Sequence, residues 1–303
     1  MRRMSAPSYH LITPAHNEAA FLPRVIAAIA AQTLKPAKWV IVDDRSRDDT
    51  WKVLQAAGRQ YPFIEPLQVR GAPGPALGSN VVRLFNAGCA RLEAEPLFVV
   101  KMDADVLLPP GYFATLLARF QAEPRLGIAS GKTYNLQQGK WVLERISDSH
   151  VTGACKTYRY TCLCDMGGLI PILGWDILDV TQARRHGWQT RSFRDLPIYH
   201  LRLTGSATGM ARANLRYGRC YYVIRAHPLF VLAKTLYRAV ERPFLMSLLI
   251  PLGYLLAALR REARLADLPL AQFLRREQLD RLRGRHLSQE EWWPRSLSRR
   301  PVD

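Results

Sequence analysis

The 303-residue sequence is poor in cysteine, in acidic residues and in long apolar segments. Its five cysteines include no Cys-x-x-Cys pair, so common zinc-site spacings are absent, and we expect reduced thiols in a cytoplasmic protein. Residues 5–10 contain no apolar stretch of the kind found in a signal peptide, so export by that route is not expected. The longest apolar run, 244–259, is interrupted by Pro251 and Gly253 and is shorter than the roughly 20 residues that span a bilayer.

The shortage of acidic residues gives the chain a net charge of +18, from 43 Lys and Arg against 25 Asp and Glu. Between residues 181 and 242, twelve basic residues face only Asp195 and Glu241. Such a field attracts nucleic acid, an anionic membrane or the diphosphate of a nucleotide sugar. Because no zinc finger, helix-turn-helix or aromatic-rich RNA-binding segment is found, nucleic acid is not an expected partner. A basic surface that is merely solvated stays an alternative.

What the sequence does contain is an alternation of short apolar runs and amphipathic stretches, which predicts an α/β fold with a largely parallel sheet. The predicted strands are residues 10–13, 39–42, 64–69, an apolar run at 97–102, 127–132 and 196–199. The predicted helices are residues 17–31 capped by Asn17, 49–61, 78–92, 112–122 and 176–186 closed by Gly187, with irregular sequence at 133–174. We expect one α/β domain over residues 1–226 and a helical extension over 227–303.

Polar motifs follow three of these strands. In open α/β sheets, ligands bind beyond the carboxyl ends of the strands, where Pro14-Ala-His-Asn-Glu18, Asp43-Asp44 and Asp103-Ala-Asp105 fall. Two carboxylates one residue apart can bind Mg²⁺ or Mn²⁺, which would neutralise a departing diphosphate. Asp44 can accept a hydrogen bond from a nucleobase. Each motif alone is also compatible with a capped turn.

Together, the motifs Pro14–Glu18, Val42-Asp-Asp-Arg-Ser46, Asn86-Ala-Gly88 and Asp103–Asp105 resemble glycosyltransferase family 2 over roughly residues 8–200. The resemblance implies the GT-A fold, a Rossmann-like α/β/α arrangement with a mixed, mostly parallel sheet, and an inverting enzyme that uses a nucleotide sugar. It also implies a nucleotide pocket near Pro14, Glu18 and Asp44, with Asp103 and Asp105 at the metal and the donor sugar.

The same resemblance implies a general base on an acidic residue that opens a helix after a glycine-containing loop. Asp176 matches this place, and Asp179 on the same helix is its rival; Asp176 can also be only a helix cap. The chain departs from the usual pattern, because Trp175 and Gln182 stand where Glu and Arg are usual. Some members of the fold use a late histidine as a metal ligand or diphosphate contact, and His200 has that place, although a structural histidine fits it as well.

The expected activity is therefore metal-dependent hexosyl transfer from a UDP- or GDP-sugar to a glycan or lipid-linked acceptor. Gln182-Ala-Arg-Arg-His186 matches the Gln-x-x-Arg-Trp motif of processive synthases only in part, which favours transfer of single sugars. Apolar helices flanked by arginine in the extension favour a peripheral position on an anionic cytoplasmic membrane face, or else a self-packed subdomain. The alternatives are an inactive nucleotide-sugar or membrane-binding protein, and a sugar-phosphate nucleotidyltransferase, whose glycine-rich loop is missing from residues 11–18.

Overall fold

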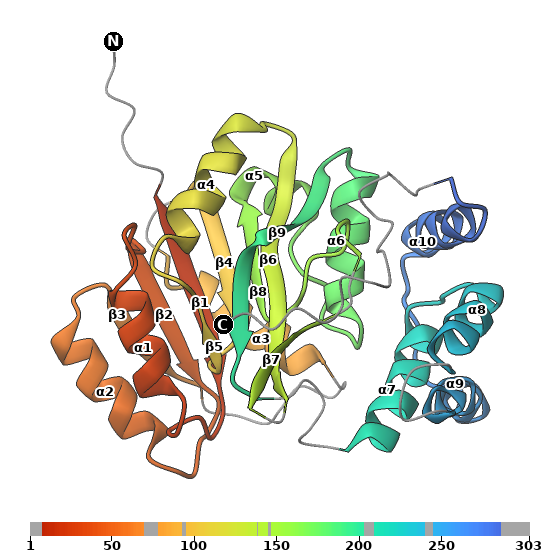
Figure 1. The fold of residues 1–303 in the computed structure, drawn as a ribbon, viewed down its shortest axis with the longest axis horizontal. Coiled ribbons are helices and arrows are strands. Elements are labelled where there is room, and N and C mark those ends of the chain that lie inside the picture. Colours follow the sequence, from red (N-terminus) through yellow and green to blue (C-terminus); the bar gives the residue numbers. More distant parts are fainter. Residues whose placement is uncertain are drawn as a thin grey trace.

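A computed structural model of the chain describes residues 8–69, 78–92, 95–137, 139–144, 147–202, 209–239 and 245–285. Within these residues, a nine-stranded mixed sheet has helices on both faces, and four further helices, α7 to α10, lie together beyond one end of it (Figure 1). Residues 1–7, Phe244 of the predicted apolar run and residues 286–303 of the predicted extension lie outside the described residues.

The sheet joins a parallel half to a largely antiparallel half. Its strands are β1 (Tyr9–Ala15), β2 (Lys38–Asp43), β3 (Ile64–Gln68), β4 (Phe98–Met102), β5 (Val106–Leu107), β6 (Leu126–Gln137), β7 (Lys140–Leu143), β8 (Cys155–Arg159) and β9 (Gln189–His200). Their order is β3-β2-β1-β4-β8-β6-β9-β5, with β7 paired to β6. The first four strands in this order are parallel, and β8 runs antiparallel to both β4 and β6.

Helices cover both faces because residues of the central strands point alternately to the two sides. In β1, Leu11 packs in one hydrophobic cluster and Ile12 in the other. The first cluster includes α1 (Leu22–Ala30), α2 (Thr50–Gln60) and α4 (Tyr112–Ala122); the second includes α3 (Ser79–Cys89), α5 (Tyr160–Asp165) and α6 (Trp175–Arg185). At Gly88 a Cβ atom would lie 2.5 Å from Ile12 Cγ2, so α3 packs directly on β1. The predicted α/β/α fold is confirmed.

Several local predictions are wrong. Asn17 does not cap a helix: it has φ 56°, its side chain accepts a hydrogen bond from Arg47 N at 2.8 Å, and α1 begins only at Leu22. The segment predicted to be irregular contains β7, β8 and α5, since β8 depends on distant partners in β4 and β6 that local sequence does not reveal. The strand predicted to be apolar contains Lys101, which is buried.

The C-terminal helices have a hydrophobic cluster of their own. They are α7 (Met210–Val223), α8 (Pro228–Ala239), α9 (Leu249–Leu259) and α10 (Leu268–Leu282), with a 3-10 turn at Met246–Leu248. Their cluster also takes in Leu178 of α6, which joins them to the sheet domain. The predicted boundary near Ala226 falls between α7 and α8. Among the described residues, every helix is too short or too polar to traverse a bilayer.

Candidate functional site

The polar motifs meet because β2, β1 and β4 are adjacent and parallel. The loop after β1 contacts the end of β2: His16 Nδ1 lies 2.6 Å from the Asp44 carbonyl oxygen, and Glu18 N donates to Thr50 Oγ1 at 2.8 Å. The loop after β4 carries Asp103 and Asp105 at the same edge. The sheet thus gathers the three motifs into one site.

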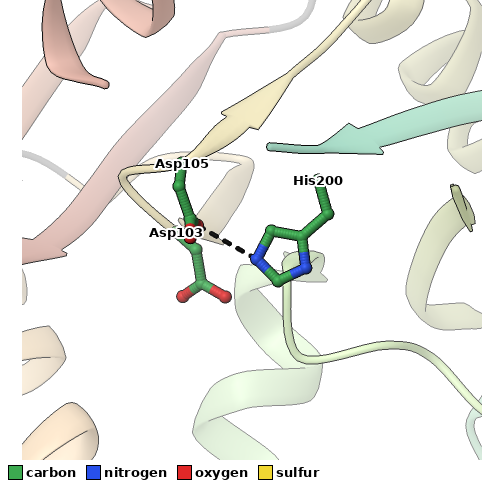
Figure 2. A group of neighbouring side chains, drawn as sticks. All are labelled: Asp103, Asp105 and His200. Atoms are coloured by element: carbon green, nitrogen blue, oxygen red, sulfur yellow. Dashed lines mark hydrogen bonds and ion pairs between the residues drawn. The ribbon is translucent and has the colours of Figure 1, made fainter. Parts of the chain in front are cut away.

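A cluster of Asp103, Asp105 and His200 forms the acidic part of this site (Figure 2). One potential ligand atom from each residue lies within 4.8 Å of the others. His200 ends β9, and the antiparallel pairing of Val106 in β5 with His200 brings the imidazole beside Asp105. Its Nε2 atom lies 3.1 Å from Asp105 Oδ1. Residues almost a hundred positions apart are therefore joined by a two-residue strand.

Positive side chains surround these carboxylates. Lys101 forms an ion pair with Asp103, and Arg202 lies with Nε 3.4 Å from Asp105 Oδ2 and donates to Glu18 Oε2 at 2.5 Å. Lys101 and Arg202 thus partly neutralise the negative charge of the cluster. Arg202 also links Glu18, in the loop after β1, to Asp105, in the loop after β4.

The protonation of this cluster depends on burial and on neighbouring charges. Burial raises the pKa of Glu18 to about 7, with Asp105 and Asp103 adding to the effect and Arg202 opposing it. Burial alone would lower the pKa of His200, but its hydrogen bond to Asp105 and the nearby carboxylates outweigh burial and raise it. In Asp105 burial would raise the pKa, but the hydrogen bond to His200 and the charges of His200 and Arg202 together lower it.

The donor atoms of the cluster fit a divalent cation. Two carboxylates and one imidazole offer oxygen and nitrogen ligands, and a cation such as Mn²⁺ or Mg²⁺ would complete its coordination with water and substrate phosphate. The carboxylates suit either ion, whereas imidazole is a commoner ligand of transition metals. The arrangement is therefore compatible with either ion.

Asp44 follows β2 at the same edge of the sheet as this cluster. It is 3% exposed, and its carboxylate accepts hydrogen bonds from Arg45 at 3.1 Å, Asn80 at 2.5 Å and Arg83 at 3.0 Å. Burial would raise the pKa of Asp44, but these hydrogen bonds and the two arginine charges together lower it. Pro14 is half-buried in β1 opposite Val42. A nucleobase that donates a hydrogen bond to Asp44 would have to share the carboxylate with these three donors.

The two rival base residues occupy different environments. The Asp176 side chain is half-buried beside Gly153, where a Cβ atom would lie 3.7 Å from Asp176 Oδ2. Asp179 is 2% exposed and accepts hydrogen bonds from Lys156 at 2.7 and 2.8 Å and from Tyr158 at 2.6 Å. Asp176 is thus the more exposed of the two, whereas Asp179 is enclosed and hydrogen-bonded by Lys156 and Tyr158.

A short stretch before β8 connects Asp176 to the acidic cluster. Asp103 N donates to Ala154 O at 2.8 Å, and Lys101 Nζ donates to Gly153 O at 2.7 Å. Since the Asp176 side chain lies against Gly153, the backbone of Asp103 and the side chain of Asp176 contact the same segment. The site therefore has an acidic cluster on one side and a separate carboxylate on the other.

Sequence analysis did not identify Lys101 as part of the site, and it assigned no definite role to Arg202. A lysine inside a buried apolar strand was the available signal for Lys101, because such a charge needs a partner. No local signal identified Arg202 as the residue that touches both Glu18 and Asp105, since the three belong to separate segments.

Comparisons of sequence are consistent with this geometry. Residues 10–152 match the family profile described as Glycosyl transferase family 2. Over 114 residues the chain is 32% identical to the validoxylamine A glucosyltransferase of Streptomyces hygroscopicus subsp. jinggangensis, an alignment that covers 37% of this chain. The chain spans 25% of the length of that relative.

Comparisons of structure support the fold. The chain is similar to the mannosyltransferase PcManGT from Pyrobaculum calidifontis, solved in complex with GDP-Man and Mn²⁺, with a TM-score of 0.58 and 18% identity over 92% of this chain and 81% of that chain. It is also similar to S. aureus TarS 1–349 in complex with UDP, with a TM-score of 0.51 and 15% identity over 93% of each chain. At these identities the likeness concerns the fold alone.

Proposed function

We propose that the chain, whose residues 10–152 match the profile described as Glycosyl transferase family 2, transfers a hexosyl group from a UDP- or GDP-sugar to an acceptor hydroxyl, with inversion. The observation that carries the proposal is the meeting of Asp103, Asp105 and His200 at the edge of the sheet where β2 ends in Asp43, with Asp176 beside Gly153. The names of two structural neighbours, which include GDP-Man and UDP, support a nucleotide donor of this kind.

On the donor side, Asp103, Asp105 and His200 would hold Mn²⁺ or Mg²⁺. The bound cation supplies charge that stabilises the departing diphosphate. Glu18 and Arg202 line the same edge, where the guanidinium can contact phosphate oxygens in a bidentate manner. Pro14 and Asp44 would line the nucleoside end of the pocket.

On the acceptor side, the Asp176 carboxylate would remove the proton from the attacking hydroxyl. We prefer Asp176 to Asp179 because a base must reach the acceptor, and Asp179 is held by Lys156 and Tyr158. Asp176→Asn should therefore abolish turnover while donor binding persists. Normal turnover in this variant would remove Asp176 from the catalytic residues.

We propose transfer of single sugars, since Gln182 lies within α6, where its amide donates to the Met166 carbonyl, and not in a separate acceptor segment. A processive enzyme would instead lengthen one acceptor repeatedly before releasing it. Product-length analysis at low enzyme concentration distinguishes the two: a single added sugar at early times is the expected result.

The test of the activity itself uses nucleotide sugars alone. A thermal-shift screen of UDP-, GDP- and TDP-sugars with and without Mn²⁺ should identify the donor, because a ligand that binds only the folded state stabilises it. Slow Mn²⁺-dependent release of nucleoside diphosphate from that donor should follow. An inactive binding protein would be stabilised but release nothing, and a nucleotidyltransferase would release pyrophosphate from a nucleoside triphosphate and a sugar phosphate.

For the acceptor, we propose a lipid-linked molecule at the cytoplasmic face of an anionic membrane, with a free glycan as the alternative. Exposed leucines form one row at helical spacing along α8 and another along α9 and the turn before it, and these helices pack against each other. The rows are Leu229, Leu232 and Leu236, and Leu248, Leu252, Leu255 and Leu259. Across residues 209–239 and 245–285, basic residues outnumber acidic ones by fourteen to four. Apolar rows with cationic surroundings suit an anionic interface.

Vesicle flotation tests this surface. The chain should float with vesicles rich in phosphatidylglycerol and less with phosphatidylcholine, and the double variant Leu232→Glu/Leu255→Glu should stay at the bottom. Leu97→Glu, at an equally exposed leucine just before β4, is the matched control and should float like the wild type. Equal behaviour of the double variant and the wild type would contradict the membrane proposal.

A further inference from the structure

Two buried lysines lie side by side beneath the candidate site. Lys101 in β4 and Lys156 in β8 are direct cross-strand partners, and they are 2% and 0% exposed. Like charges directly opposite each other on a sheet are destabilising, and a buried ammonium group needs compensation. Two buried lysines directly opposite each other indicate a functional requirement, because proteins tend to accept such unfavourable arrangements at their sites.

The compensation comes from two directions. Lys101 pairs with Asp103 and donates to Gly153 O at 2.7 Å. Lys156 pairs with Asp179 and donates to the backbone oxygen of Asp176 at 2.7 Å. One lysine is therefore bound to the acidic cluster, and the other is bound to the residue proposed as the base.

Both ammonium groups lie near the indole ring of Trp175, which is 8% exposed. Lys101 Nζ lies 5.4 Å from the ring centroid and Lys156 Nζ 5.3 Å, within the range of a cation–π interaction. A single aromatic ring thus contacts both ammonium groups, and it immediately precedes Asp176 in the chain.

The backbone that enters α6 fixes this ring. Gly174 caps the helix with φ 90°, and a Cβ atom there would lie 2.7 Å from both Cys220 Sγ and Ile224 Cγ2. The chain can therefore turn into the helix only along a narrow path against α7. The ring, the two lysines and the helix start form one connected unit.

We propose that Trp175, in contact with both Lys101 and Lys156, is a positioning residue that fixes the Asp176 carboxylate relative to Asp103. The inference rests on the proposed function, because it concerns the distance between the base and the donor-side cluster. The contacts run from Asp103 through Lys101, Trp175 and Lys156 to the Asp176 backbone without a gap.

The test compares two substitutions of similar size at Trp175. Trp175→Phe keeps an aromatic face for the ammonium groups, whereas Trp175→Met keeps apolar volume without one. The assay is Mn²⁺-dependent release of nucleoside diphosphate from the nucleotide sugar that stabilises the wild type. Trp175→Met should lower kcat about tenfold to a hundredfold, the range expected when a catalytic group is misplaced by about 1 Å. Its donor KM should stay within about twofold, and Trp175→Phe should retain most of kcat.

Trp188→Leu is the matched control, because this half-buried tryptophan follows the far end of α6 and donates to Asp165, away from the candidate site. It should leave kcat and KM unchanged. Wild-type kcat in Trp175→Met, or a parallel loss of kcat and of nucleoside diphosphate binding, would overturn the positioning role. If Trp175→Met does not fold, Lys156→Met combined with Asp179→Asn tests the same contact, with the same expected loss of kcat at constant KM.

The assay also separates this inference from the proposed function. A wild-type chain that releases no nucleotide from any UDP-, GDP- or TDP-sugar with Mn²⁺ refutes the proposed transfer. A wild type that releases nucleotide, together with an equally active Trp175→Met variant, refutes only the role of the tryptophan.

Discussion

Replacing Lys156 by Met should destabilise the fold far more than a typical surface substitution does. The ammonium group is fully buried and donates to both oxygens of Asp179, whose carboxylate is also buried. Burial lowers the pKa of Lys156 and raises the pKa of Asp179, while the attraction between the two groups opposes both changes. The pair itself contributes little, but breaking it leaves one charge without a partner, at a cost of about 3–5 kcal/mol.

That cost is large against a total stability of about 5–15 kcal/mol. With a urea dependence of about 3 kcal/mol per molar, the unfolding midpoint should fall by about 1 M or more in urea titrations followed by circular dichroism. Adding Asp179→Asn should recover much of the loss, since the buried negative charge disappears while the amide oxygen still accepts from the Tyr158 hydroxyl. An unchanged midpoint for Lys156→Met, or no recovery in the double variant, would refute the reasoning.

Three further predictions concern the metal and the C-terminal helices. Asp105→Asn should abolish the extra thermal stabilisation that Mn²⁺ gives with nucleoside diphosphate, about 2.7 kcal/mol at a hundredfold excess over Kd in the wild type; retention of the shift would exclude Asp105 as a ligand. Because the pKa of His200 is raised and a metal ligand must be neutral, Mn²⁺ affinity measured calorimetrically should rise from about pH 6 to about pH 8, and a His200→Gln variant should lose this slope. Gly218→Ala should lower the free energy of unfolding, measured by thermal denaturation, by about 1–3 kcal/mol, since the new Cβ atom would lie 1.8 Å from Ile250 O. Gly111→Ala should leave the free energy of unfolding unchanged, because a Cβ atom there meets nothing within 4 Å.

Local sequence determined the parallel half of the sheet and the residues at its edge. Each of β1, β2 and β4 is a short, mostly apolar segment followed by polar residues, so its strand and its loop can be predicted from adjacent positions. The order of these strands then places Glu18, Asp44 and Asp103 at one edge of the sheet. Gly187 at the end of α6 was equally local, because a helix that ends in a left-handed residue favours glycine.

Tertiary structure decided what depends on distant partners. β8 was missed because its role comes from antiparallel pairing with β4 and β6, and its own sequence carries no strong period. Asp176 and Asp179 are three residues apart on one helix, and only packing encloses Asp179 with Lys156 while leaving Asp176 beside Gly153. Sequence specifies which carboxylates are available, because strand ends and helix starts are local patterns. Packing specifies which of them is free to react, because burial and charge pairing are set by residues far away in the chain.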